Sequence, residues 1–103
     1  MKTQILRKLF LGFMQVHILY HAKKGPIFGA YMIEELKSHG YNISAGTLYP
    51  LLHSLASSGL LSRDNKLVGG KIRKYYNITS QGEAVLNEAR IRAEELVKEL
   101  KEE

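Results

Sequence analysis

The sequence predicts a mainly helical fold with one small β-hairpin, in the order helix, helix, helix, strand, strand, helix. Three observations lead to this class. Apolar residues recur at helical spacing in four segments of the 103-residue chain. Breaks at Gly25-Pro26, Gly40 and Ser58-Gly59 end the first three of these segments. Residues 71–78, by contrast, alternate with the two-residue period of a β-strand.

The first predicted helix spans residues 4–22 and has two apolar faces on a helical wheel. One face is a broad stripe of Ile5, Leu6, Leu9, Phe13, Val16 and Tyr20. The other is a separate patch of Leu11, Met14 and Ile18. A helix on the surface of a domain needs only one apolar face. We therefore expect its own domain to cover one side and a second subunit to cover the other, and we assign the patch to the second subunit.

The second and third helices are shorter. The second is predicted over residues 28–39, and we expect Gly40 to end it, because glycine accepts the left-handed backbone of a C-terminal cap. The third is predicted over residues 44–58 and contains Pro50. Its inward face consists of Leu48, Leu51, Leu52 and Leu55.

A β-hairpin is predicted to follow. The segment "LLSRD" (residues 60–64) has the pattern of a strand, "NKLVGG" (65–70) that of a turn, and "KIRKYYNI" (71–78) that of the return strand. In the return strand Ile72, Tyr76 and Ile78 share one face. A helix-turn-helix followed by such a hairpin is a winged helix-turn-helix.

The last predicted helix begins near Thr79, where both Thr79 and the capping-box sequence "SQGE" from Ser80 are candidates for the N-terminal cap. Its apolar residues follow the spacing of a coiled-coil seam. The seam consists of Leu86, Ala89, Ala93, Leu96 and Leu100. Because it spans only about two heptads, it needs another surface, and the first helix is the expected partner. We therefore expect a winged helix-turn-helix domain over residues 1–78 and a C-terminal dimerisation helix over residues 79–103.

Charge is distributed unevenly along the chain. Residues 1–78 hold 11 Lys and Arg against 3 Asp and Glu, whereas residues 79–103 hold 4 against 7, for a net charge of +5. A basic domain favours nucleic acid or an anionic surface as its partner. Cysteine is absent, which excludes disulfides and thiolate metal sites. Polar residues at Gln15, His17 and His21 interrupt the apolar N-terminal segment, so we expect no export signal, no membrane span and a cytoplasmic location.

Two motifs resemble the PadR family of bacterial transcriptional regulators. They are "GTLYPLLHSL" (residues 46–55) and "KYYNIT" (74–79), within a similarity that runs from Phe28 to Gly82. The flanking helices resemble the short-tailed branch, which has a single C-terminal helix. The resemblance implies a dimeric DNA-binding winged helix, usually a repressor, whose C-terminal helix packs across the first helix of the other subunit. Ser54 and Ala56 replace the Arg and Glu common in the family, so residues 44–58 contain no Lys or Arg.

The outward face of the third helix is the candidate base-reading surface, with Tyr49, Pro50 and His53 opposite the leucines. Tyr49 fits either packing on a neighbouring loop or contact with thymine methyl groups in the major groove, and the fold favours the second. Pro50 allows two interpretations. The helix either starts late, with Thr47 as its cap, or starts earlier with a loosened first turn that leaves the N–H groups of Gly46 and Thr47 free to meet a phosphate.

The hairpin is the second candidate DNA-binding surface, because Lys66, Lys71, Arg73 and Lys74 cluster there. Lysines also protect exposed strand edges. Four cations close to one turn nevertheless fit phosphate contacts better. Lys74 falls on the same strand face as Ile72 and is the weakest member of the group.

These patterns together predict a sequence-specific DNA-binding transcriptional regulator, acting as a homodimeric repressor on a palindromic operator. A small apolar effector is a further candidate partner. The residues proposed to bind it are Phe10, Met14, Ile18, Leu96 and Val97. Two alternatives stay open: a winged helix that binds protein instead of DNA, and a dimer whose main role is to sense a ligand.

Neither an enzyme nor a cofactor-binding protein is expected. The sequence contains no visible set of nucleophile, base and orienting group. His17 and His21 lie one helical turn apart, the spacing at which two imidazoles can share a metal. A zinc site usually needs three or four protein ligands, and no third is visible near them in the sequence, so no metal site is expected.

Overall fold

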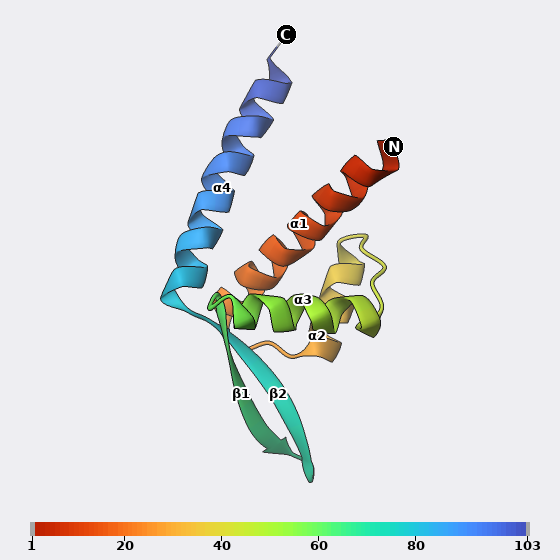
Figure 1. Cartoon of the computed structure of the whole chain (residues 1–103), viewed down its shortest axis with the longest axis vertical. Coiled ribbons are helices and arrows are strands. Elements are labelled where there is room, and N and C mark those ends of the chain that lie inside the picture. The colour runs from red at the N-terminus through yellow and green to blue at the C-terminus, as the bar shows by residue number, and fades with distance from the viewer. Residues whose placement is uncertain (1, 103) are drawn as a thin grey trace.

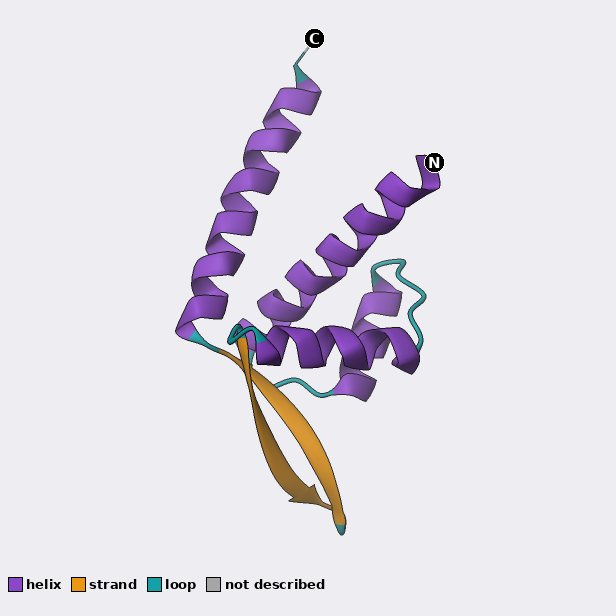
Figure 2. Cartoon of the chain, in the orientation of Figure 1, coloured by secondary structure: helices purple, strands orange, loops and turns teal. Residues whose placement is uncertain are grey.

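The computed structural model describes residues 2–102 and contains four helices and a two-stranded antiparallel sheet (Figure 1). The elements are α1 Lys2–Lys24, α2 Gly29–Ser38, α3 Ala45–Ser57, β1 Leu61–Val68, β2 Lys71–Ile78 and α4 Ser80–Lys101. The predicted order and mainly helical class are confirmed. The hairpin and α4 project toward opposite ends of the molecule (Figure 2), which measures 57 × 29 × 22 Å. Within residues 2–102, no helix combines the length and hydropathy needed to span a bilayer.

The core lies between α1, α2, α3 and the base of the hairpin. Its fully buried side chains are Ile18, Ile27, Met32, Leu36, Leu48, Leu52 and Leu61. Leu48 and Leu52 belong to the predicted inward face of α3, so the opposite face of this helix is left in solvent. Ile27 and Tyr76 exchange two backbone hydrogen bonds, with N···O distances of 2.9 and 2.8 Å. This pairing fixes the base of the hairpin to the segment that leads into α2.

Gly40 ends α2 as predicted. Its φ of 90° is in the left-handed region. The Gly40 N–H donates to the Lys37 carbonyl at 3.0 Å, and the Tyr41 N–H donates to the Leu36 carbonyl at 2.9 Å. These two bonds form a Schellman motif, which satisfies the last carbonyls of the helix. The motif also fixes His39, the C-cap residue, in one backbone position.

Thr79 is the N-cap of α4, so the first of the two predicted cap candidates holds this position. Its hydroxyl oxygen accepts a hydrogen bond from the Gly82 N–H at 3.0 Å. The same hydroxyl donates to the Gly59 carbonyl at 2.6 Å, just beyond the end of α3. One side chain therefore both starts α4 and holds it against the helix-turn-helix.

The first hairpin strand is longer than predicted, whereas the return strand has the predicted bounds. β1 continues to Val68, so residues 65–68, which the sequence pattern places in the turn, pair in register with residues 71–74. The turn consists of Gly69 and Gly70 alone, with φ angles of 57° and 79°. Two successive residues with positive φ form the tight turn that best fits the twist of a hairpin. The predicted turn is wrong because two glycines suffice, and the preceding residues are free to extend the strand.

α1 uses its two apolar faces in the opposite sense to the prediction. Met14 and Ile18, assigned to a partner subunit, are buried in the core of their own chain, and Leu11 packs against the same core. The exposed face is instead the broad stripe, with Ile5, Leu6, Leu9, Phe13 and Tyr20 in solvent. The assignment of the patch to the second subunit is therefore corrected: a partner of α1 would meet the stripe.

The seam of α4 is covered by α1 only in its first half. Leu86 packs against the core and Ala89 is partly buried, whereas Leu96 and Leu100 are exposed. In Figure 1 the two helices diverge toward their free ends. The far half of α4 thus presents apolar side chains that its own chain does not cover.

Candidate nucleic-acid interface

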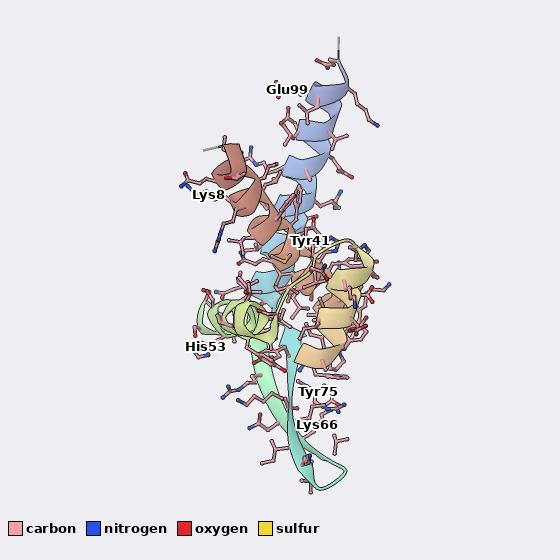
Figure 3. All side chains as sticks on the ribbon, turned by 90° about the vertical axis from the view of Figure 1, so that its right-hand side faces the viewer. Lys8, Tyr41, His53, Lys66, Tyr75 and Glu99 are labelled. Atoms are coloured by element: carbon pink, nitrogen blue, oxygen red, sulfur yellow. The ribbon has the colours of Figure 1, made fainter. Side chains whose placement is uncertain are left out.

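The exposed face of α3 carries the predicted base-reading residues. Tyr49, Pro50 and His53 are all exposed, on the side of the helix opposite buried Leu48 and Leu52. Figure 3 shows His53 on the outer side of α3 and Lys66 and Tyr75 on the hairpin below it. The helix face and the hairpin therefore border the same end of the molecule.

The start of α3 decides between the two interpretations of Pro50. The helix begins at Ala45 with Ser44 as N-cap, so Pro50 is its sixth residue and the late start capped by Thr47 is wrong. The predicted free N–H of Thr47 is also wrong, because this group donates to the Ser44 carbonyl at 3.1 Å. Proline at this position leaves the Gly46 carbonyl without its usual helical donor.

Tyr49 packs on the first residue of α2 while keeping 45% of its surface exposed. Gly29 lies directly under the phenol ring, and a Cβ added to Gly29 would collide with the hydroxyl and the ring carbons of Tyr49. The two interpretations of Tyr49 are thus compatible: one edge is fixed by packing and the rest faces solvent. Gly29 is therefore required for the observed orientation of Tyr49, a role that the sequence did not suggest.

Three of the four predicted hairpin cations share one face of the sheet. Lys66 pairs directly with Arg73 across the strands, and Lys71 lies two residues from Arg73 on the same side. Lys74 pairs with Asn65 on the opposite face. All four side chains are exposed. The register therefore concentrates positive charge on one face of the hairpin, which suits contact with a line of phosphates.

Aromatic rings hold two of these cations in place. The Arg73 guanidinium lies 4.2 Å from the centre of the Phe28 ring, and the Lys66 ammonium lies 5.4 Å from that of Tyr75. The Phe28 and Tyr75 rings meet edge to face at 5.5 Å. Phe28 is the N-cap residue of α2. These cation–π contacts link the charged face of the hairpin to the helix-turn-helix.

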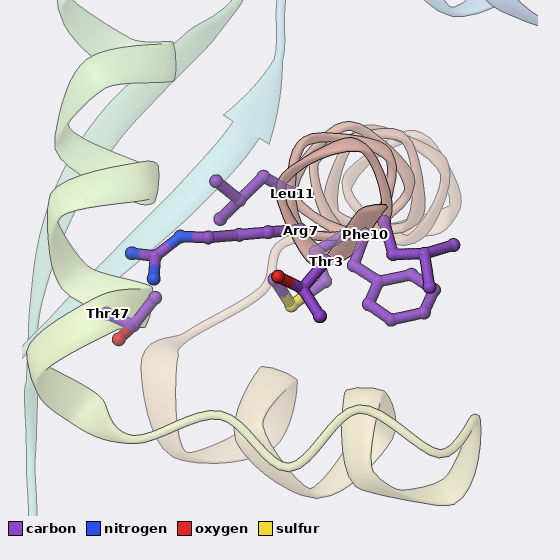
Figure 4. A pocket seen from close by; sticks show the side chains of 7 residues that line it. Thr3, Arg7, Phe10, Leu11 and Thr47 are labelled. Atoms are coloured by element: carbon purple, nitrogen blue, oxygen red, sulfur yellow. The ribbon is translucent and has the colours of Figure 1, made fainter. Parts of the chain in front are cut away.

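Two further arginines lie beside α3 and were not predicted. Arg63 of β1 and His53 of α3 line the same cleft of about 310 Å³. In Figure 4 the Arg7 side chain extends from α1 toward Thr47 near the start of α3, across a cleft of about 460 Å³. α3 itself lacks Lys and Arg, so these neighbouring arginines supply positive charge at both of its ends. Their positions depend on tertiary packing and are not visible from spacing along the sequence.

The predicted effector residues do not form one pocket within the chain. Phe10 and Met14 line the cleft that contains Arg7, and Phe10 meets Tyr41 edge to face at 5.9 Å. Ile18 is fully buried in the core and cannot line a cavity, which corrects its assignment. Leu96 and Val97 are exposed on the far half of α4.

Histidines form a separate cluster between α1 and α2. His39 joins His17 and His21, so the expectation of no third ligand is corrected. Burial lowers the pKa of both His17 and His21 below the ordinary histidine value, and for His17 the neighbouring His39 and His21 add to this effect. The lowered pKa favours the neutral form of both imidazoles, and Glu35 acts in the opposite direction. Glu35 lies beside the cluster, with its carboxylate 3.4 Å from His21 Nε2.

A helix-turn-helix followed by a basic hairpin defines the winged-helix class of DNA-binding domains. Residues 18–88 match the transcriptional regulator PadR-like family, and the chain belongs to this family. The transcriptional regulator Rv3488 of Mycobacterium tuberculosis is 41% identical over 95 residues, which cover 92% of this chain and 89% of that protein. Family membership makes this chain a transcriptional regulator, not an enzyme.

Solved structures of the family have the same fold. A PadR family transcriptional regulator from Eggerthella lenta superposes with a TM-score of 0.82 at 33% identity, covering 95% of this chain and 87% of that one. A PadR-like transcription factor from Bacteroides fragilis gives a TM-score of 0.81 at 31% identity, covering 94% and 95%. The similarity extends over α1 and α4 as well as the winged helix.

Proposed function

We propose that this protein is a homodimeric repressor that binds a palindromic operator through α3 and the hairpin. The observation that carries the proposal is the placement of an exposed face of α3 without Lys, Arg, Asp or Glu beside a hairpin on which Lys66, Lys71 and Arg73 share one face. Such a pair of surfaces suits a duplex, where a helix enters the major groove and basic side chains contact the backbone. Repression is then steric, because a bound dimer blocks polymerase.

The two surfaces have different roles in this proposal. Tyr49, Pro50 and His53, with Thr47 and Gly46 at the helix start, discriminate between sequences. Without Lys or Arg they cannot make the common bidentate contact to guanine, so thymine methyl groups and groove shape carry the discrimination, and the half-sites contain A·T pairs. The phosphate-binding residues are Lys66, Lys71, Arg73 and Lys74.

Selection of bound DNA from a random pool tests this function. We expect an enriched palindrome with A·T-containing half-sites whose centres are about one helical turn, roughly 34–36 Å, apart. Absence of any enriched sequence at low salt would contradict DNA recognition and support a protein-binding winged helix. Enrichment of guanine at the positions that α3 reads would overturn the assigned role of Tyr49.

The dimer is supported by the apolar surfaces that one chain leaves uncovered. The stripe on α1 and the far half of α4 are both exposed. The structural similarity to the Eggerthella lenta regulator covers 95% of this chain, so it includes both helices as well as the rest of the fold. We propose that α4 of one subunit covers the α1 stripe of the other. Each subunit then presents one recognition helix to one half-site.

Leu100→Asp tests the dimer, because Leu100 is 73% exposed and lies in the proposed interface. Leu67→Asp is its matched control, since Leu67 is 74% exposed at the tip of the hairpin. Light scattering after gel filtration should show a dimer for the wild type and for Leu67→Asp, and a shift toward monomer for Leu100→Asp. A monomeric wild type, or equal dissociation in both variants, would contradict the arrangement.

A small apolar effector is a second proposal, favoured by the groove between α1 and α4. The groove has a volume of about 1140 Å³ and is lined by Phe13, Val16, Tyr20, Leu86 and Ala93, among others. Flat hydrophobic dyes should bind the dimer and lower its affinity for operator DNA. If the dyes neither bind nor change DNA affinity, the groove is not an effector site.

A further inference from the structure

Three of the four histidines in the sequence meet at one place between α1 and α2. α1 supplies His17 and His21, one helical turn apart, and the C-terminal end of α2 supplies His39. One ring nitrogen from each of these residues lies within 4.8 Å of the others. His53, the remaining histidine, is on the exposed face of α3. Polar side chains that only contact solvent do not need to converge, so three imidazoles that meet from two helices indicate a binding site.

The backbone holds His39 in this position. As the C-cap of α2 it precedes Gly40, and the Schellman motif around Gly40 fixes the path of the chain. The His39 ring stacks on the His17 ring with centres 4.5 Å apart and an angle of 26° between the planes. His17 in turn contacts Tyr41 edge to face at 5.6 Å. The cap and the ring stacking together place the third imidazole, which is 43% exposed, beside the other two.

Glu35 adds a carboxylate to the cluster. Its Oε1 lies 3.4 Å from His21 Nε2 and 3.8 Å from His39 Nε2. The His21 side chain is only 10% exposed, and its buried Nε2 forms no hydrogen bond with any residue that the structure describes, Glu35 included. The Tyr31 hydroxyl faces the other nitrogen, Nδ1, at 3.5 Å. A buried nitrogen without a partner is costly, and it points at a carboxylate that is poorly placed to accept from it.

We propose that His17, His21, His39 and Glu35 bind one divalent transition-metal ion, of the class of Zn²⁺ or Co²⁺. Three imidazoles and a carboxylate are a suitable ligand set for such an ion, whereas Mg²⁺ and Ca²⁺ prefer oxygen ligands. In tetrahedral coordination with metal–nitrogen bonds of about 2.0–2.1 Å, ligand atoms are about 3.3 Å apart. The Glu35–His21 separation already matches this value, and the most distant pair needs to approach by about 1.5 Å, which imidazole rotation can supply.

The site is accessible to an ion. All four proposed ligands line the groove between α1 and α4. Metal binding would join α1 directly to the end of α2, just before the segment that leads into the recognition helix. This role is independent of the proposed operator recognition, since no residue of the DNA-binding surfaces takes part.

Titration of the metal-stripped full-length protein with Co²⁺, followed by competition with Zn²⁺, tests the site. We expect one Co²⁺ per chain with the visible absorption of tetrahedral cobalt, and displacement by Zn²⁺. His39→Ala should weaken binding by about 100-fold or more, and Glu35→Gln should weaken it by more than the roughly 10–100-fold typical of losing a group that only supports a ligand. His53→Ala is the matched control and should bind as the wild type does.

His39→Cys makes the test independent of folding defects. A thiolate is also a ligand for zinc and cobalt, and the chain contains no other cysteine. This variant should restore binding and add a sulfur-to-cobalt charge-transfer band. Weak, non-stoichiometric binding by the wild type, unchanged affinity in His39→Ala, or equal loss in His53→Ala would each overturn the proposal.

Discussion

The recognition helix α3 and the hairpin differ in how they are held and in what they expose. α3 has its leucine face buried in the core and shows solvent a face without Lys, Arg, Asp or Glu that carries Tyr49 and His53. The hairpin is buried only at its base, and its outer half is a ribbon exposed on both faces, with three of its four predicted cations on one of them. A rigid surface suits the reading of shape and methyl groups. A charged, solvent-exposed ribbon suits phosphates, which are the same in every sequence.

The largest expected effect is on stability. Leu52→Ala, under α3, should lower the free energy of unfolding by about 2–5 kcal/mol, because it leaves a cavity in the core. Ile72→Ala, in the outer hairpin where the side chain is 70% exposed, should change it by about 0.5 kcal/mol or less. Denaturant unfolding at one fixed protein concentration measures both. Equal losses would mean that the outer hairpin is as firmly packed as α3.

The second prediction concerns the contact that orients Tyr49. Gly29→Ala should destabilise the wild type by about 1–3 kcal/mol, since the new methyl group overlaps the tyrosine ring. In a Tyr49→Ala background the clash is gone, and the same change should be neutral or stabilising by up to about 1 kcal/mol, as alanine favours a helix over glycine. Unfolding of the four variants in a double-mutant cycle gives the result. A cost that is the same in both backgrounds would show that Gly29 does not position Tyr49.

The smallest expected effect separates the two faces of the hairpin. Lys71→Ala removes a cation from the face shared with Lys66 and Arg73, whereas Lys74→Ala removes one from the opposite face. Lys71→Ala should reduce the salt dependence of DNA binding by about 0.9 in the log–log slope for each phosphate that the protein no longer neutralises, and Lys74→Ala by less. Titrations at several salt concentrations measure both slopes. A larger change for Lys74→Ala would place the phosphates on the other face.

Local signals in the sequence are sufficient for most of the fold. Helical spacing of the leucines, the left-handed glycine at Gly40 and the cap at Thr79 all depend on residues within a few positions of each other, so they can be read without tertiary information. The length of β1 is not predictable in this way, because a Gly-Gly turn sets the register by itself. The amino acids at residues 65–68 are compatible with a longer turn as well as with a longer strand, and only the observed pairing shows that they belong to the strand.

Features that depend on packing between helices and strands cannot be predicted from local sequence patterns. Both faces of α1 are apolar, and periodicity alone does not say which one its own domain covers, so the prediction for Met14 and Ile18 names the wrong neighbour. His39 is distant in sequence from His17 and reaches it only through the turn at the end of α2. Arg63 reaches α3 through the pairing of the hairpin in the same way.

The central claim is that α3 discriminates between DNA sequences and the hairpin binds phosphates. Its most direct test is a fluorescence anisotropy titration of wild type, Tyr49→Ala and Lys66→Ala. Each is titrated against the selected operator and against random duplex DNA at several salt concentrations. Tyr49→Ala should cost about 1–3 kcal/mol on the operator and little on random DNA, with the salt slope unchanged. Lys66→Ala should weaken both DNAs alike and reduce the slope by about 0.9 for each phosphate left without its lysine, twice that if both subunits contribute one. If Tyr49→Ala weakened both DNAs equally, or Lys66→Ala left the slope unchanged, the division of roles would be contradicted.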